Sequence, residues 1–427
     1  METLINPNQI RDAILEKNSV ILRLGSSHTT RRQHFVIKNG FLFVLYGTSL
    51  FYTKCSEMKT TATSYETSTN MPNRTEIANF STTSIGNSDV NQRLWFTTNG
   101  NYLYVRNDNT IQRYTVTWGA DYSTVAFSDM LTITPQNNGA SITMLFIDIS
   151  ADNSKILITA KISNKNTICV LDLTDIETTP TKNITILTGN IHNTNQDYSA
   201  YFFTENESYP IAEFYTNAGG TSTGISSCTL YSLSETALTE YKTEEYAYRQ
   251  HNPTAFLAGF EKFKDNKGNY HIIQCVGYAL NNNTDVESYY GYVMVNGATI
   301  QTYKCWTSNI GSSFEFAQPV NTYFQNNKYY LFCGTTFLAL NQNWEVVADT
   351  LVLLNWTTAN RLVASFMYDG DCFYTGGSYG YPTYMKLQMW LDKKVASVKT
   401  VTVNNKQQQI VMYAQPTDQN IDTGIYD

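Results

Sequence analysis

The residues of this chain that could do chemistry are a few carboxylates, histidines and cysteines set among aromatic segments. A glycosidase needs two carboxyl groups about 5–10 Å apart, and Glu205, Glu213, Asp369 and Asp371 are candidates for such a pair. Sequence alone leaves this pair open, because loops from separate sheets can meet in space. No catalytic constellation accompanies these carboxylates. We therefore expect a non-enzymatic protein and keep a glycan hydrolase or lyase as an alternative.

Other chemical motifs have simpler structural explanations. The segment 220–224 (GTSTG) matches G-x-S-x-G, but it lies between strand patterns and not at a strand-to-helix turn, so we expect a flexible loop. The five histidines include no pair four residues apart on a helix and no HExxH motif, and neither thiolates nor imidazoles converge as a zinc site requires. The segment 265–269 (DNKGN) resembles a calcium loop faintly and a hairpin turn better. We expect no metal and no cofactor.

The cysteines favour reduced, buried thiols. There are seven, an odd number, and none are spaced as CxxC. Most stand inside apolar strand patterns such as TICVL and YLFCG, where cysteine packs as a small hydrophobic residue. The first residues, METLINPNQIRDAILEK, lack the pattern of a secretory signal, and no stretch reaches the ~20 apolar residues of a membrane span. We expect synthesis in a reducing cytoplasm and no association with a membrane.

The elements that must position these residues follow a repeat. An apolar, aromatic strand leads into a polar turn and then into two further alternating strands, most clearly over Phe146–Leu173. Similar units begin at Arg93, Tyr323 and Leu362, and successive units lie roughly 40–55 residues apart, which is typical of four-stranded propeller blades. We predict an all-β β-propeller of about seven blades, with six or eight left open. The predicted core includes Phe146, Ile156, Ile158, Val170 and Leu331.

The domain organisation follows from this repeat. We predict an N-terminal segment (1–18) with a short helix, a propeller (19–417) and a tail (418–427). Segment 409–414 is predicted to close the ring by pairing with strands near the N-terminus. Segments 56–79, 217–224 and 378–382 interrupt the repeat and are predicted to be loops.

Composition excludes one large class of partner. Charged residues make up 15% of the chain, against roughly 25% in an average domain, and the net charge is −7. The polarity comes from Asn, Thr and Ser, and there are 31 tyrosines. Since nucleic-acid binding needs a basic stripe, we expect no nucleic-acid partner.

Two resemblances add to this interpretation. The run FIDIS, the turn ADNSK, the strand ILITA and the closing ICVLDL make the unit Phe146–Leu173 resemble a WD40-type blade, although it lacks the terminal Trp-Asp and the preceding Gly-His pair. In whole-chain character the protein resembles β-propeller components of bacteriophage tails, necks and collars. That resemblance implies a structural or attachment protein of a virion, made in the host cytoplasm and present in several copies in a symmetric ring.

The same resemblance implies a set of partners and contact residues. The partners would be a portal, adaptor or tail-ring protein, with a host-surface glycan as a further candidate. Loops on a rigid scaffold often carry binding, so we expect contact residues in them. The expected contact residues are Tyr65, Asn73, Asn217, Thr221, Tyr379 and Tyr381, and the expected anchor residues are Ile10, Ile14 and Leu15. A carbohydrate- or receptor-binding propeller remains the main alternative.

Overall fold

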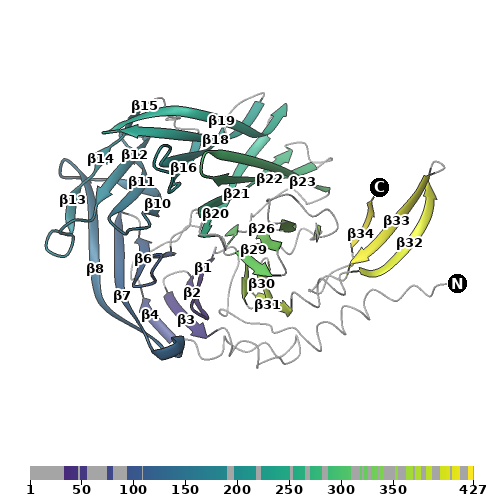
Figure 1. Ribbon diagram of the computed structural model, residues 1–427, viewed down its shortest axis with the longest axis horizontal. Coiled ribbons are helices and arrows are strands. Elements are labelled where there is room, and N and C mark those ends of the chain that lie inside the picture. The colour runs from purple at the N-terminus through teal and green to yellow at the C-terminus, as the bar shows by residue number, and fades with distance from the viewer. Residues whose placement is uncertain are drawn as a thin grey trace.

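A computed structural model shows a protein made almost entirely of antiparallel strands (Figure 1). It describes residues 33–46, 49–54, 75–79, 94–107, 109–189, 197–217, 223–250, 253–264, 270–280 and 287–308, and a further set of strands between 318 and 426. In this described part the one helical element is the short 3-10 turn η2 (Ala120–Tyr122). The predicted all-β class is confirmed.

Seven sheets, here called blades 1 to 7, follow one another along the chain. Blade 1 contains β1 (Gln33–Lys38), β2 (Phe41–Tyr46), β3 (Ser49–Lys54) and β4 (Thr75–Asn79). Blade 2 contains β5 (Leu94–Phe96), β6 (Tyr102–Asn107), β7 (Thr110–Trp118) and β8 (Val125–Asn137), with β9 (Ala140–Ser141) paired to β8. Blade 3 contains β10 (Thr143–Ile149), β11 (Lys155–Ile162), β12 (Lys165–Asp172) and β14 (Thr185–Ile186).

The remaining blades have the same plan. Blade 4 contains β16 (Asp197–Phe203), β17 (Ile211–Asn217), β18 (Thr223–Ser234) and β19 (Ala237–Gln250). Blade 5 contains β20 (Pro253–Lys264), β21 (Tyr270–Leu280), β22 (Glu287–Asn296) and β23 (Thr299–Ser308). Blade 6 contains β25 (Thr322–Gln325), β26 (Lys328–Cys333), β27 (Thr336–Leu340) and β28 (Val352–Leu353), and blade 7 contains β24 (Gln318–Pro319), β29 (Leu362–Tyr368), β30 (Asp371–Gly376) and β31 (Tyr381–Lys386).

The blades form a ring. Within each blade most strands pair with their sequence neighbours as an antiparallel meander. The first strands of neighbouring blades approach one another, as β10 does to β16, and β1 lies beside both β5 and β29. Blade 7 therefore returns to blade 1. A closed series of four-stranded meanders is a β-propeller, so the predicted architecture and the predicted count of about seven blades are confirmed.

Tight Asn-Gly turns produce these meanders. Asn39 and Gly40, between β1 and β2, have φ angles of 48° and 80°. Asn138 and Gly139, between β8 and β9, have φ angles of 49° and 84°. Two successive left-handed residues define the hairpin turn that Asn-Gly favours, because its twist matches that of the strands.

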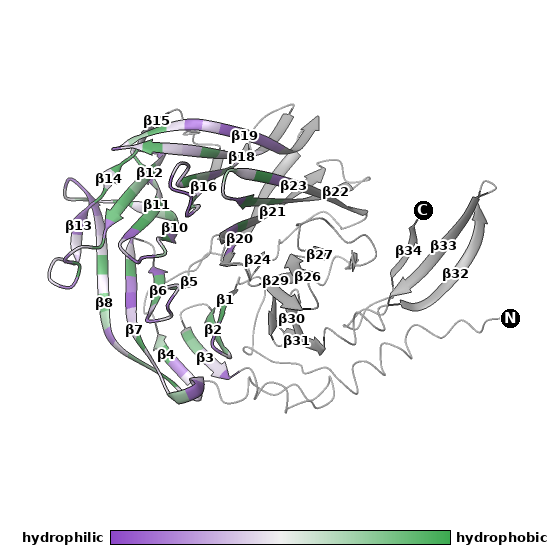
Figure 2. Ribbon diagram, viewed as in Figure 1, coloured by the Kyte–Doolittle hydropathy of each residue, from purple (hydrophilic) through white to green (hydrophobic). Residues whose placement is uncertain are grey.

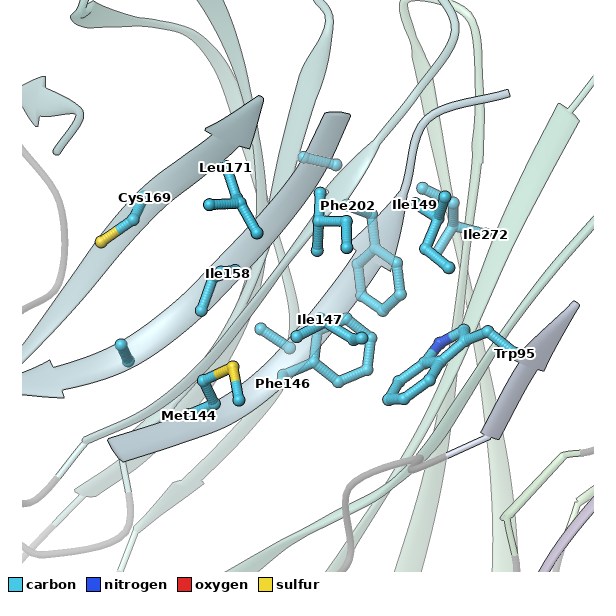
Figure 3. Close-up of a cluster of buried hydrophobic side chains, with 14 of the residues drawn as sticks. Trp95, Met144, Phe146, Ile147, Ile149, Ile158, Cys169, Leu171, Phe202 and Ile272 are labelled. Carbon is cyan, nitrogen blue, oxygen red and sulfur yellow. The ribbon is translucent and has the colours of Figure 1, made fainter. Parts of the chain in front are cut away.

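The core lies between blades, where strands such as β11 are buried on both faces. Ile156 and Ile158 pack with Phe146 and other residues of blades 2 to 5, whereas Leu157 on the opposite face packs against blade 4. Figure 2 shows hydrophobic residues on the strands and hydrophilic residues at many of the turns, and Figure 3 shows Trp95, Phe146 and Phe202 close together. The predicted burial of Phe146, Ile156 and Ile158 is confirmed. Val170 is only partly buried, and the side chain of Leu331 lies outside the described residues.

Two thiols lie in this core. Cys169 and Cys228 are buried and free, as predicted for reduced cysteines. Burial raises the pKa of Cys169 to about 12, because the thiolate would be desolvated. The thiols of both residues are therefore poorly reactive.

One segment ties the outer edges of three blades together. Residues Thr181–Gly189, here called the strap, form β13 (Thr181–Asn183), β14 and β15 (Thr188–Gly189). β13 pairs in parallel with β8 of blade 2, β14 pairs with β12 of blade 3, and β15 pairs in parallel with β19 of blade 4. Nine residues thus cover part of three sheet edges that would otherwise be open.

The end of the chain corrects one prediction. β33 (Lys406–Tyr413) pairs on one side with β32 (Val395–Val403) and on the other with β34 (Asp422–Tyr426), in a sheet of its own. Its predicted pairing with N-terminal strands is therefore wrong, because a local hairpin satisfies its backbone with little loss of chain entropy. Figure 1 shows this sheet to one side of the ring. The predicted domain boundary at 417 lies between the paired strands β33 and β34.

All three predicted loops are also shorter than expected. Within segment 217–224, Asn217 ends β17 and Thr223 begins β18, so the flexible loop expected at 220–224 is partly strand. Within segment 56–79, Thr75–Asn79 forms β4, the fourth strand of blade 1. Within segment 378–382, Tyr381 begins β31. In each segment the run of alternating apolar and polar residues is too short, next to the polar residues of the loop, to be recognised as a strand from sequence.

Candidate functional site

The first turns of blades 2, 3 and 4 share one hydrogen-bonded design, with a hydroxyl residue followed two positions later by Asn or Asp. In blade 3, Asp152 Oδ1 accepts hydrogen bonds from Ser150 Oγ (2.6 Å) and from the backbone N–H of Ser154 (3.0 Å). In blade 2, Asn99 Oδ1 accepts from Thr97 Oγ1 (2.8 Å) and from the N–H of Asn101 (3.0 Å). Side chains thus satisfy backbone donors that the strands leave unpaired.

The blade 4 turn follows the same plan. Asn206 Oδ1 accepts from the backbone N–H groups of Ser208 (2.9 Å) and Tyr209 (3.0 Å). The N–H of Asn206 in turn donates to Thr204 Oγ1 over 3.2 Å. These three turns, together with Asn39–Gly40 of blade 1, are here called the turn face.

Neighbouring turns on this face are joined. Lys38 Nζ at the end of β1 donates to the Thr98 carbonyl oxygen of blade 2 over 3.0 Å. The Tyr104 hydroxyl of blade 2 donates to Asn153 Oδ1 in the blade 3 turn over 2.9 Å. Side-chain hydrogen bonds brace the turns of blades 2, 3 and 4 internally, and the two links above join blades 1 to 3, so the turn face has an ordered backbone.

A buried ion pair links blades 3, 4 and 5 next to this face. Asp148 of β10 lies 3.2 Å from Lys262 Nζ of β20 and accepts the backbone N–H of Phe203 of β16 at 2.8 Å. Glu205 lies 3.6 Å from the same ammonium group. Burial raises the pKa of Asp148, and the positive charge of Lys262 opposes that rise. The Asp148 side chain is 6% exposed, so it joins blades and is poorly placed to meet a substrate.

Glu213, a predicted candidate for acid or base chemistry, is fully buried inside blade 4. It accepts hydrogen bonds from the hydroxyls of Ser199 (3.0 Å), Tyr201 (2.6 Å) and Tyr231 (2.5 Å). Burial and then the nearby Glu213 carboxylate raise the pKa of both tyrosines, so both hydroxyls keep their protons and donate. With no exposed surface, this carboxylate is a structural hydrogen-bond acceptor.

Of the other candidate carboxylates, only Glu205 has a described side chain. Glu205 pairs with Lys262, and Asp371 begins β30 of blade 7, where the backbone alone is described. Asp369 lies outside the described residues. Among the side chains that the structure describes, no three His, Cys, Asp or Glu residues are grouped to hold a metal ion.

The predicted contact residues fall mostly outside the described part of the chain. These are Tyr65, Asn73, Thr221 and Tyr379, and the anchor residues Ile10, Ile14 and Leu15. Asn217 ends β17 of blade 4, and Tyr381 begins β31 of blade 7, so the two belong to different sheets. In the described residues no helix is long and apolar enough to cross a membrane.

Sequence reasoning missed the turn face, although the sequence held a signal for it. Thr97 and Asn99, Ser150 and Asp152, and Thr204 and Asn206 repeat the same hydroxyl-x-Asx spacing at intervals of 53 and 54 residues (150 − 97 and 204 − 150). This interval matches the blade repeat. Sequence reasoning also missed the turn between β7 and β8, which carries an exposed tyrosine, Tyr122.

Comparisons with known proteins show distant likeness to propeller structures. Kuenenia stuttgartiensis hydrazine synthase aligns with 84% of this chain and 96% of its own, at 10% identity and a TM-score of 0.47. The Myceliophteria thermophila Cps50 (Swd1) β-propeller domain aligns with 86% of this chain and 99% of its own, at 9% identity and a TM-score of 0.46. A Trichoderma reesei protein of Carbohydrate-Active Enzymes Family AA12 aligns with 87% of this chain and 96% of its own, at 12% identity and a TM-score of 0.37.

These similarities are too weak to assign an activity. No protein-family model matches the chain, and no curated protein sequence matches it. Function must therefore be argued from the chain itself.

Proposed function

We propose that the protein is a non-enzymatic attachment scaffold that binds partners through its turn face. The observation that carries this proposal is the contrast between two sets of polar groups. The buried carboxylates of Glu213 and Asp148 are engaged in structural bonds, Glu213 inside blade 4 and Asp148 between blades. The turns, by contrast, leave polar side chains such as Asn99 and Ser208 exposed on a braced backbone, which suits binding at low entropic cost.

At a finer level we propose that the scaffold is a structural component of a bacteriophage virion. The low charge, the abundance of Asn, Thr and Tyr, and the propeller form of the chain support this assignment. Its partners would be a portal, adaptor or tail-ring protein, contacted by several copies in a ring. It would be synthesised in the host cytoplasm and then incorporated into the particle.

Mass spectrometry of density-purified particles tests the virion assignment. The protein should co-sediment with capsid protein at a constant ratio across the particle peak. Its presence in the infected lysate together with its absence from that peak would contradict the assignment.

A glycan-binding propeller is the second candidate function, and one observation favours it. Tyr122 is 54% exposed and lies edge-on to Trp118, with ring centroids 5.9 Å apart. Binding without turnover distinguishes this candidate from a hydrolase or lyase. Purified protein incubated with host-surface glycan should release no new reducing ends, and release that depends on Glu205 would support the enzymatic alternative.

A further inference from the structure

The turn between β7 and β8 holds its exposed tip in a strained backbone conformation. Asp121 and Tyr122 have φ angles of 53° and 54°. This left-handed region is uncommon for residues other than glycine and is most unusual for a bulky side chain such as tyrosine. Neither residue is buried. The one ring contact of the tip is the edge-on contact between Tyr122 and Trp118, and more than half of the Tyr122 side chain stays exposed, which makes the tip a candidate for function.

The conformation of the tip is fixed by hydrogen bonds within the turn. The N–H of Gly119 donates to the Thr124 carbonyl oxygen over 2.9 Å, and the N–H of Tyr122 donates to the Gly119 carbonyl oxygen over 3.1 Å. A Cβ at position 119 would lie 2.2 Å from Thr124 Oγ1, so any larger residue there would force that hydroxyl to move. The tip is therefore ordered before any ligand arrives.

Contacts with the first turn of blade 2 and with strands of blade 1 brace this turn further. Trp118 Nε1 donates to the Gly100 carbonyl oxygen over 2.9 Å, and the Trp118 ring packs against Phe41 of blade 1 at a centroid distance of 6.0 Å. Lys54 Nζ of blade 1 donates to the Ser123 carbonyl oxygen over 3.3 Å. Figure 1 shows this turn near the strands of blade 1. A ligand bound here would span the junction of blades 1 and 2.

The groups at this junction are one exposed aromatic ring and several small polar side chains. Lys38, Asn39 and Trp118 gather around Gly100, since a Cβ built there would lie 3.0 Å from Lys38 Cε, 3.3 Å from Trp118 Nε1 and 3.9 Å from Asn39 Nδ2. Asn99 in the first turn of blade 2 and Asp121 and Ser123 in the second turn are exposed. Aromatic faces, amides, hydroxyls and a carboxylate are thus presented together.

We propose that this junction, centred on Tyr122 and Trp118, is a binding subsite for a neutral sugar ring. A tyrosine ring offers a flat apolar surface at low entropic cost, and the surrounding amide and hydroxyl groups can bond the hydroxyls of a pyranose. Of the four large hydrophobic side chains exposed in the described part of the chain, one lies in this turn. A single exposed ring matches the size of one sugar unit, whereas a standard protein interface buries about 800 Å² on each partner. The exposed Asp121 carboxylate in the turn repels an acidic sugar, and the ammonium groups of Lys38 and Lys54 each already donate one hydrogen bond to a backbone carbonyl oxygen, so we expect a neutral sugar.

This subsite deepens the proposed binding role, but it does not depend on membership of a virion. Saturation-transfer NMR and calorimetry on the purified full-length protein test it with methyl glycosides of glucose, galactose and N-acetylglucosamine, and with sialyllactose as the acidic probe. At least one neutral glycoside should bind more tightly than sialyllactose. Tighter binding of sialyllactose, or no binding of any neutral probe, would overturn the proposal.

Matched variants locate the binding. Tyr122→Ala should weaken neutral-glycoside binding on the order of tenfold, and Tyr122→Phe, which keeps the ring, should stay within about twofold. Tyr241→Ala is the control, because Tyr241 is similarly exposed at 49% but stands on β19 of blade 4. Circular dichroism checks that all three variants are folded. Equal loss in Tyr122→Ala and Tyr241→Ala, or no loss in Tyr122→Ala, would overturn the location of the subsite.

Discussion

At the residue scale, the most informative side chain is Glu213, a carboxylate without exposed surface in the middle of β17. Three hydroxyl groups donate to it, from Ser199, Tyr201 and Tyr231. Such a cluster is stable when every member is satisfied and costly when one is removed. It is therefore a sensitive point for stability and an unsuitable one for catalysis.

Glu213→Ala should lower the free energy of unfolding by about 3–5 kcal/mol, because three buried hydroxyls lose their acceptor. Glu213→Gln keeps one acceptor oxygen and should cost less. Urea unfolding measures both variants, and sugar binding at the blade 1–2 junction serves as the control that the rest of the ring is intact. Destabilisation of Glu213→Ala no greater than that of an exposed substitution such as Glu207→Ala would contradict the structural role.

The Asp148–Lys262 pair predicts a pH dependence whose sign follows from the shift. The pKa of Asp148 is raised in the folded protein above its ordinary value of 3.8, mainly by burial. Its contribution to stability is therefore fully present below that ordinary value and is lost as pH rises through the folded pKa. Lys262→Met removes the opposing charge and should raise the folded pKa of Asp148 further. The destabilisation by this variant should accordingly be larger at slightly alkaline pH than at mildly acid pH.

Unfolding of Lys262→Met by urea at the two pH values measures this difference. The double variant Asp148→Asn, Lys262→Met removes the titrating carboxylate and should show a much smaller pH dependence. Destabilisation by Lys262→Met that is the same at both pH values would mean that Lys262 does not act through the ionisation of Asp148, and would leave its contact over the Phe203 ring, 5.8 Å from the ring centroid, as its role.

At the element scale, the repeated hydroxyl-x-Asx turn makes blades 2, 3 and 4 directly comparable. Hydrogen bonds from Ser150 and Ser154 hold the pKa of Asp152 below its ordinary value of 3.8, so its stabilising effect is present above that value and is lost as pH falls through the folded pKa. Asn stands at the matching positions 99 and 206. Asp152→Asn should therefore be nearly neutral and should remove this acid-dependent loss.

Asp152→Ala, by contrast, removes the acceptor and should cost about 0.5–1.5 kcal/mol at neutral pH, toward the lower end because the turn is solvated. Thermal unfolding of the two variants side by side gives the comparison. If Asp152→Asn were as destabilising as Asp152→Ala, the negative charge and not the shared acceptor geometry would be what the turn requires.

The strap gives a prediction about how blades are held together. The N–H of Thr188 donates to the Thr236 carbonyl oxygen of blade 4 over 2.7 Å. Thr188→Pro removes this donor and should speed proteolysis near the strap and lower the free energy of unfolding by about 1–3 kcal/mol. Thr188→Ala keeps the N–H and is the matched control. Equal protease sensitivity in the two variants would show that this backbone bond does not secure the edge of blade 4.

Sequence predicted the strands of each blade better than the links between blades. The repeat Phe146–Leu173 became β10, β11 and β12 because alternation and polar turns are local signals. The strap carries no such signal, since its short strands depend on the edges of three separate sheets. Glu213 was equally hidden, because a charged residue inside a strand ordinarily indicates a solvent-facing position. Its burial depends on hydroxyls from two other strands.

At the scale of the whole molecule, the ring closes through blades and not through the end of the chain. The count of about seven blades follows from a repeated pattern, and sequence predicted it. Closure is a long-range property, and the sequence offered strand-like residues at 409–414 as a plausible closing strand. The structure instead places β1 beside β29 and gives β33 two neighbours of its own. A short hairpin forms with less loss of chain entropy than a strand that returns across the whole molecule.

This arrangement predicts that the sheet β32–β34 can be removed without opening the ring. A chain ending at Lys386, the last residue of β31, keeps every strand of blades 1 to 7 and the approach of β1 to β29. Its melting temperature should stay within a few degrees of the full chain, since the core between blades is unchanged.

A second truncation, ending at Cys333, is the control. It removes β27, β28 and all of blade 7 except β24, which opens the ring, and it should melt much lower or fail to fold. Differential scanning calorimetry of the three chains makes the comparison. A sharp fall in the melting temperature of the Lys386 truncation would show that the terminal sheet completes the propeller after all, whereas equal stability of the Cys333 truncation would show that the ring is not closed through blade 7.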